Sequence, residues 1–164
     1  MAPDVDALTS VWLLKRFLPG WDEAELAFVP AGKTLHNDPV YVYAEILHVD
    51  TGMGKLDHHQ TDEDTCAAKR TMQFISKTQS ASWRTNVKGQ KLAGKNFKKF
   101  PDEALERMID IVNDIDHFRE VYYPNPMADF YDFGMVSILD GWKLIYSESH
   151  VKVVELSMLI LDGI

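Results

Sequence analysis

The stretch Leu47–Gln60, LHVDTGMGKLDHHQ, decides how we interpret this chain. A short apolar run ends in Asp50, a Gly-x-Gly turn and a second short run follow, and Asp57 then precedes two adjacent histidines. Strand ends that lead into turns are where an open α/β sheet presents ligating side chains. Carboxylate and imidazole together suit Mn, Fe, Zn or Co. The stretch predicts half of a metal site, and a surface hairpin with solvated polar residues is the alternative.

The segment Pro3–Leu8 supplies two further acids at the start of the chain. Asp4 and Asp6 precede an apolar-periodic stretch that predicts a helix over 7–18, which the following Pro-Gly pair ends. Acids at a helix start stabilise its first turn through the unpaired N–H groups and the helix dipole. Considered alone, this segment is explained by helix capping.

Considered together, three motifs in sequence order resemble the first three motifs of the DHH phosphoesterase family. They are residues 3–7 (PDVDA), 49–52 (VDTG) and 57–60 (DHHQ). The family includes RecJ-type single-strand exonucleases, small oligoribonucleases, cyclic-dinucleotide phosphodiesterases and family II inorganic pyrophosphatases. The close spacing of the second and third motifs is most similar to a compact branch that includes a eukaryotic organellar exonuclease. The resemblance covers residues 3 to about 120.

The fold that this resemblance implies is an α/β catalytic domain, with a mostly parallel sheet and flanking helices. The order of elements along the chain agrees, because strands that alternate with helices indicate parallel pairing through crossover helices. A chain of 164 residues is expected to form one domain, 1–164, without the substrate-binding domain that usually follows in the family. Strands are expected at 26–30 and 40–49, and helices at 7–18, 66–75, 101–117, 130–146 (interrupted at Gly141) and 151–161.

The fourth motif of the family is a single metal-binding aspartate, expected within the helix over 101–117. At 100° per residue, Asp116 lies on the apolar stripe between Ile109 and Val112, whereas Asp114 points almost opposite. An acid on a core-facing stripe is costly unless it is paired or bound to metal. Asp116 is therefore the predicted ligand. Asp114 is the alternative, because it fits the spacing to a later aromatic residue in several family members.

The resemblance implies hydrolysis of a phosphoester with two bound metals, Mn²⁺ or Mg²⁺. His59 is implied to contact the phosphate, and Asp57 is interpreted as a carboxylate that orients an imidazole. The metal ligands implied are Asp4 for the first metal, Asp50 as the bridge between both metals, and Asp6, His58 and Asp116 for the second.

The family normally has an apolar strand and a histidine before the first aspartate, and both would fall before Met1. We therefore expect the first metal to bind weakly and this chain to hydrolyse phosphoesters slowly. The same observation motivates one alternative, a truncated, inactive metal-binding remnant.

The segment 79–100 is basic and contains no acid, although the chain as a whole carries a net charge of −8. We interpret it as a loop insertion in which lysines grip phosphates and aromatic rings stack on bases. A solvated insertion is the alternative. The substrate-binding candidates are Lys95, Lys98 and Lys99 in this segment, together with Lys55 and Arg70.

Composition limits the remaining possibilities. A single cysteine, Cys66, fits a reducing cytoplasm, and the chain has neither a membrane-spanning run nor a signal peptide. The nearly continuous apolar residues of 151–161 leave two explanations open, a homodimer through this helix or a longer protein. The predicted function is a phosphodiesterase acting on single-stranded or short nucleic acid. The alternative enzyme is a pyrophosphatase or small-phosphoester hydrolase.

Overall fold

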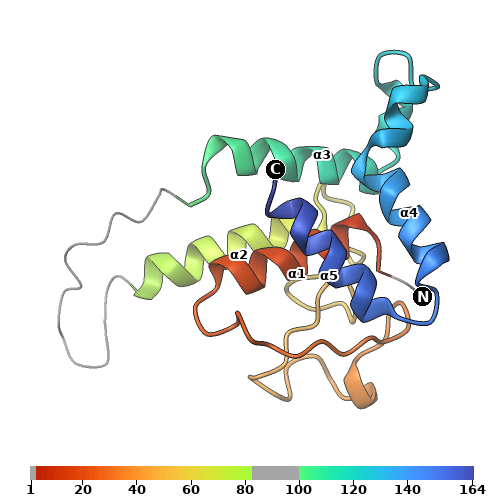
Figure 1. Ribbon diagram of the computed structural model, residues 1–164. Coiled ribbons are helices and arrows are strands. Elements are labelled where there is room, and N and C mark those ends of the chain that lie inside the picture. The colour runs from red at the N-terminus through yellow and green to blue at the C-terminus, as the bar shows by residue number, and fades with distance from the viewer. Residues whose placement is uncertain (1–2, 83–99) are drawn as a thin grey trace.

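The computed structural model describes residues 3–82 and 100–164, and its described part is built from helices (Figure 1). The α-helices are α1 (Val5–Phe17), α2 (Ala67–Ser82), α3 (Glu103–Asp116), α4 (Met135–Ile145) and α5 (His150–Leu161). Three short 3₁₀ helices accompany them: η1 (Leu35–Asn37), η2 (Arg119–Tyr122) and η3 (Asp129–Phe133).

The predicted α/β fold with a mostly parallel sheet is wrong. Helices account for 53% of the structure and strands for 1%, and in the described part of the chain the β-pairing is one isolated parallel bridge, between Val49 and Leu56. A strand is stabilised by a neighbouring strand and by burial of one face. Apart from the bridge at Val49, the two segments expected to be strands pair with no described strand, and they leave large side chains in solvent: Phe28 is 40% exposed and Tyr41 69% exposed. They run instead as turns and irregular backbone.

Helix α1 lies at the centre of the core. Eight of its 13 residues are buried, and they include polar as well as apolar side chains. A helix that is buried around most of its circumference must be covered by several neighbours. Helices α2, α3 and α5 all contact α1, and Figure 1 shows α2 alongside it and α5 crossing it. The helix starts at the cap residue Asp4 and ends two residues before Pro19.

The chain between α1 and α2 is largely irregular and lies below the helices in Figure 1. Side chains hold it by hydrogen bonds to the backbone. Lys15 Nζ donates to the carbonyl oxygen of Ala24 at 2.7 Å, and the N–H of Leu35 donates to His48 Nε2 at 3.0 Å. This segment matters for function because it carries Asp50 and the adjacent histidines to the helices.

The C-terminal helix α5 returns to α1. Asp162, directly after α5, accepts hydrogen bonds from the Trp12 indole at 2.9 Å and from the Arg16 guanidinium at 2.7 and 2.6 Å. Although the apolar residues of α5 are nearly continuous along the chain, this helix is not covered on all sides, since Val151 is 49% exposed and Leu159 is 69% exposed. Among the described residues, no helix combines the length and the apolar character needed to cross a membrane.

Candidate metal centre

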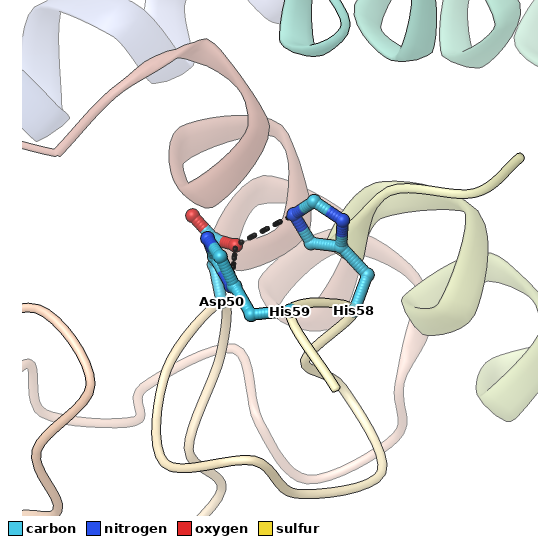
Figure 2. Close-up of side chains that lie close together, drawn as sticks. All are labelled: Asp50, His58 and His59. Carbon is cyan, nitrogen blue, oxygen red and sulfur yellow. Dashed lines mark ion pairs between the residues drawn. The ribbon is translucent and has the colours of Figure 1, made fainter. Parts of the chain in front are cut away.

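Side chains from three parts of the chain meet around the imidazole of His58. Asp6 comes from the first turn of α1, and Asp116 is the last residue of α3. Asp50 directly follows Val49, the first residue of the Val49–Leu56 bridge. His58 Nε2 lies 3.4 Å from Asp50 Oδ1 and 3.5 Å from Asp116 Oδ2. Asp6 Oδ2 is 3.8 Å away. Figure 2 shows the carboxylate of Asp50 facing the rings of both His58 and His59.

The distances between these side-chain atoms fit ligands of one cation, and so does the lack of hydrogen-bond partners at two of them. Neither His58 Nε2 nor Asp50 Oδ1 has a hydrogen-bond partner among the described residues, although both atoms are buried. Buried polar atoms without a partner are costly and rare. Ligand atoms bound about 2.0–2.2 Å from one divalent ion lie about 3–4 Å from each other. Two sets have ligand atoms within 4.8 Å of one another: Asp6, His58 and Asp116, and Asp50, His58 and His59.

Asp6 is held in place by the start of α2. Its two carboxylate oxygens accept hydrogen bonds from the N–H groups of Ala67 and Ala68, at 2.7 and 2.8 Å. The first N–H groups of a helix have no partner within the helix, so a buried carboxylate satisfies them and is stabilised by them. The same contacts fix the orientation of Asp6 towards His58. Hydrogen bonds of this kind hold metal ligands in position.

Asp57 braces the loop that carries the two histidines. Its carboxylate is buried and accepts hydrogen bonds from the N–H of Met53 at 2.6 Å and from the N–H of His59 at 3.1 Å. It also accepts a hydrogen bond from His59 Nδ1, at 2.7 Å. Asp57 thus lies against an imidazole that it can orient, and its role in the site stays a prediction. The His59 ring is more than half exposed, so its other nitrogen is accessible.

Two glycines let this loop pass close to its neighbours. A Cβ at Gly54 would lie 2.5 Å from Val40 Cγ1, and at Gly52, where φ is +77°, it would lie 2.8 Å from Thr34 Cγ2. Asp50 itself has φ +54°, a conformation that non-glycine residues adopt at a cost. The tight loop therefore holds Asp50 in a strained backbone conformation.

Crowding of carboxylates governs the electrostatics of the site. Burial and neighbouring negative charges, those of Asp6 and Asp4 foremost, raise the pKa of Asp50 to about 9. Burial also raises the pKa of Asp6, even though hydrogen bonds from α2 oppose the shift. The pKa of Asp116 is raised by burial as well, against the opposing effect of His58. A divalent cation would neutralise this excess of negative charge.

Asp57 behaves differently from the other acids. Burial alone would raise the pKa of Asp57, but hydrogen bonds from His59 and from the backbone of Met53 outweigh it and hold the pKa below its ordinary value. This carboxylate is therefore already satisfied by the protein, as an orienting group requires.

The structure separates the two candidates for the fourth motif. Asp116 lies beside His58, whereas Asp114 contacts Arg119 Nη1 at 3.4 Å and accepts a hydrogen bond from the Tyr123 hydroxyl at 3.3 Å. Asp114 is thus engaged in a surface network, and the helical period that favours Asp116 agrees with this placement.

The other predicted site residues have mixed outcomes. Asp4 is exposed and caps α1 by accepting a hydrogen bond from the N–H of Ala7 at 2.9 Å. It belongs to neither ligand set found among the described residues. Lys55 and Arg70 line one cavity beside α2. The remaining candidates, Lys95, Lys98 and Lys99, fall outside the described residues.

His117 also lies beside the predicted ligands, although no motif in the sequence pointed to it. Its Nδ1 lies 3.5 Å from Asp116 Oδ2 and 2.8 Å from the carbonyl oxygen of Asn113. The side chain of Asn113 is buried and donates to Asp64 at 2.7 Å, and Asp64 also accepts from Arg119. This network anchors the end of α3 beside His58. The available signal was the position of His117 directly after the predicted ligand.

Comparisons with models of known families, with curated proteins and with solved structures find no match to this chain. The resemblance to DHH phosphoesterases therefore stays a prediction that rests on the motifs, and the geometry around His58 is an independent observation.

Proposed function

We propose that this chain is a metal-dependent phosphoesterase that hydrolyses phosphodiester bonds of single-stranded or short nucleic acid. The observation that carries the proposal is the buried Nε2 of His58, which has no hydrogen-bond partner among the described residues and faces three carboxylates at 3.4 to 3.8 Å. An imidazole among carboxylates is a ligand set for a divalent cation, and the imidazole favours Mn²⁺ over Mg²⁺. The ligands would be Asp6, Asp50, His58 and Asp116.

A divalent metal in this position supplies a water of lowered pKa and neutralises charge on a phosphoryl oxygen. The contribution of the protein is to hold the ligands rigidly. Asp6 is fixed by α2, Asp50 by the tight loop, and Asp116 by its position at the end of α3. Preorganised groups of this kind lose little entropy when substrate binds.

His59 is the residue best placed to act on the substrate. Its Nδ1 donates to the buried carboxylate of Asp57, which fixes the ring and leaves Nε2 on the exposed side. In this orientation Nε2 can donate to a phosphate oxygen or transfer a proton to a leaving oxygen. The buried ligands and the exposed His59 together describe a centre that substrate approaches from one side.

The cellular setting that fits this proposal is the cytoplasm. Cys66 is a free, buried thiol, and burial raises its pKa well above its ordinary value, which keeps the thiol protonated and inert.

Calorimetric titration with Mn²⁺ tests the ligand assignment. We expect binding in the micromolar range or tighter, weakened at least about a hundredfold by His58→Ala and by Asp116→Asn, because changes to groups that merely orient ligands already cost about 10–100-fold. Asp114→Asn is the matched control, since it removes an acid two residues away that contacts Arg119 instead. Equal binding by the wild type and both ligand variants would overturn the proposal.

Substrate profiling tests the reaction class. With Mn²⁺ present, a 5′-labelled single-stranded oligonucleotide should be shortened, His59→Ala should slow the reaction, and EDTA should stop it. Pyrophosphate is the comparison substrate. Faster hydrolysis of pyrophosphate than of the oligonucleotide would contradict the nucleic-acid assignment, and hydrolysis that persists in EDTA would contradict the metal.

A further inference from the structure

A cavity of about 570 Å³ lies beside α2, and cationic side chains outnumber acids two to one in its lining. This volume is within the range of pockets that bind small ligands. The charged side chains that line it are the cations Lys55, Lys69, Arg70 and Lys77 and the acids Glu63 and Asp64. On a chain with a net charge of −8, such a concentration of positive charge is a local exception that favours an anionic ligand.

One face of α2 forms the long wall of this cavity. Arg70, Gln73 and Lys77 are spaced at i, i+3 and i+7, so they lie on the same side of the helix. Thr71 and Ile75, on another side of the helix, are buried in the core. From Arg70 to Lys77 the helix axis advances about 10 Å. The wall is therefore longer than a single phosphate group.

Several of these cations are not neutralised by the protein. Lys77 is exposed and has no ion pair with any described residue. The Nζ of Lys55 lies 4.1 Å from the centre of the Phe74 ring, and no acid in residues 3–82 or 100–164 pairs with it. Arg70 Nε is buried and finds no hydrogen-bond acceptor among the described residues, and Arg70 reaches only Glu63, at 3.4 Å. A bound anion would give these groups the partners that they lack.

The acid and the lysine nearest to α3 are already paired. Asp64 accepts from the Asn113 side chain and from Arg119, and these contacts hold its pKa well below its ordinary value. Lys69 Nζ lies 3.0 Å from Asp110 Oδ1. These pairs tie α2 to α3 and its flanking loop, so they support the wall of the cavity and leave Arg70, Lys77 and Lys55 available to an anion.

The cavity and the metal centre share one helix. The first N–H groups of α2, at Ala67 and Ala68, hold Asp6, and Arg70 follows one turn later. The loop residues 63–65, which also line the cavity, come three to five residues after the DHHQ motif. A chain of phosphates with one group at the metal centre can thus continue along α2.

We infer that the cavity beside α2 binds the phosphates that flank the scissile bond in a single-stranded nucleic acid. The place of the scissile phosphate rests on the proposed function, whereas the binding of the strand rests on the cationic wall alone. Arg70 and Lys77 contact the phosphates, and Lys55, whose Nζ lies over the Phe74 ring of α2, is the third cation available to them. Pyrophosphate is too short to reach from the metal centre along this wall.

Fluorescence anisotropy of a labelled single-stranded oligonucleotide, measured in EDTA so that nothing is cleaved, tests this inference. On single strands, each phosphate contact contributes about 0.7 to the slope of log Kd against log salt concentration. Loss of one contact should therefore weaken binding about fivefold at 0.1 M salt. Arg70→Gln with Lys77→Gln should therefore raise Kd about 25-fold and lower the slope by about 1.4. Lys152→Gln, on α5, is the matched control because it removes one exposed, ion-paired lysine far along the chain.

Several outcomes decide the matter. An unchanged Kd in the double variant, an equal loss in Lys152→Gln, or no binding by the wild type would each overturn the inference. If circular dichroism shows that Arg70→Gln is unfolded, Lys55→Gln with Lys77→Gln replaces it, since both lysines are exposed. Competition identifies the ligand chemistry. Inorganic polyphosphate should displace the oligonucleotide, and pyrophosphate that displaces it equally well per phosphate would rule out a strand.

Kinetics separate this inference from the proposed function. The double variant should raise KM for the oligonucleotide and leave kcat for a small phosphodiester such as bis(p-nitrophenyl) phosphate unchanged. Binding that depends on Arg70 and Lys77 without any hydrolysis would refute the phosphoesterase and leave the strand site standing. Hydrolysis of the oligonucleotide that does not depend on Arg70 or Lys77 would refute the strand site and leave the phosphoesterase standing.

Discussion

Two groups of carboxylates in this protein have opposite environments. Asp64 and Asp162 accept hydrogen bonds from arginine, and these bonds lower the pKa of each acid. Asp6, Asp50 and Asp116 instead crowd around His58, and burial raises the pKa of all three. The first group is satisfied by the chain itself. The second is not, and buried charge that the protein leaves unsatisfied is a property of binding and catalytic sites.

The largest expected difference between the two groups is in activity. Asp50→Asn should lower Mn²⁺-dependent hydrolysis at least about a hundredfold, because an amide is a poor ligand for a metal that needs negative charge. Asp162→Asn should change the rate by less than about twofold, since its partners are Trp12 and Arg16. Initial rates on the labelled oligonucleotide measure both. A comparable loss in the two variants would erase the distinction.

Asp50→Asn, which should lower activity, should raise the stability of the metal-free protein. In the folded, metal-free protein the pKa of Asp50 is about 9, against about 4 when unfolded, so folding takes up a proton at neutral pH. Stability should therefore fall as pH rises from about 4 towards 9. Asp50→Asn has no proton to take up, and we expect it to raise the unfolding free energy by about 2 kcal/mol at pH 7.

Thermal unfolding in EDTA measures this gain, which corresponds to about 4–8 °C for a chain of this size. The advantage of the variant should shrink at pH 5. Added Mn²⁺ should then stabilise the wild type and leave Asp50→Asn unaffected. A variant less stable than the metal-free wild type at pH 7 would show that the carboxylate is satisfied without metal.

The sequence allowed better predictions of the candidate site residues and the helix starts than of the fold. Asp116 could be chosen over Asp114 because the helical period is local, and the cap at Asp4 and the start of α3 depend only on neighbouring residues. Local signals of this kind could not decide whether the apolar segments 26–30 and 40–49 form strands. An apolar run becomes a strand only if a partner lies beside it, which is a non-local property.

The site itself shows the same limit. The candidate ligands and their order along the chain are predicted from the motifs. The contact of Asp6 with the start of α2 joins residues 61 positions apart, and nothing in either segment specifies it. His117 joins the cluster because α3 ends there and turns its ring back to the carbonyl oxygen of Asn113. Such contacts depend on the tertiary packing of helices.

The glycines extend the comparison to the backbone. Gly54→Ala would place a Cβ 2.5 Å from Val40 Cγ1, and overpacking of this kind costs about 1–3 kcal/mol. Because the loop carries Asp50 and His58, we also expect Mn²⁺ affinity to fall about tenfold. Val40→Ala in the same chain should restore the affinity, and calorimetry on the four-member cycle measures the coupling. If the two substitutions change Mn²⁺ affinity additively, the Cβ at position 54 and the Val40 side chain are not in steric conflict.

Among the satisfied carboxylates, the expected effects are smaller. Asp162→Asn should lower the unfolding free energy by about 1 kcal/mol, because its ion pair with Arg16 is more than a third exposed. The pKa of Asp162 is lowered by Arg16 first and by Trp12 second, so its contribution is present above pH 4 and is lost as pH falls below it. Urea unfolding at pH 7 and pH 3 should show a difference between wild type and variant only at pH 7.

The smallest effect belongs to Gly141, which the sequence suggested would interrupt a helix. Helix α4 continues through it, and a Cβ there would meet no atom within 4 Å. Glycine in a helix interior costs about 0.5–1 kcal/mol relative to alanine, so Gly141→Ala should raise the unfolding free energy by about 0.5 kcal/mol and leave Mn²⁺ binding unchanged. Thermal unfolding and calorimetry on this variant and on Gly54→Ala form a matched pair. A loss of metal affinity in Gly141→Ala would mean that α4 is coupled to the centre around His58, and that tolerance to a methyl group does not distinguish the site loop from the outer helices.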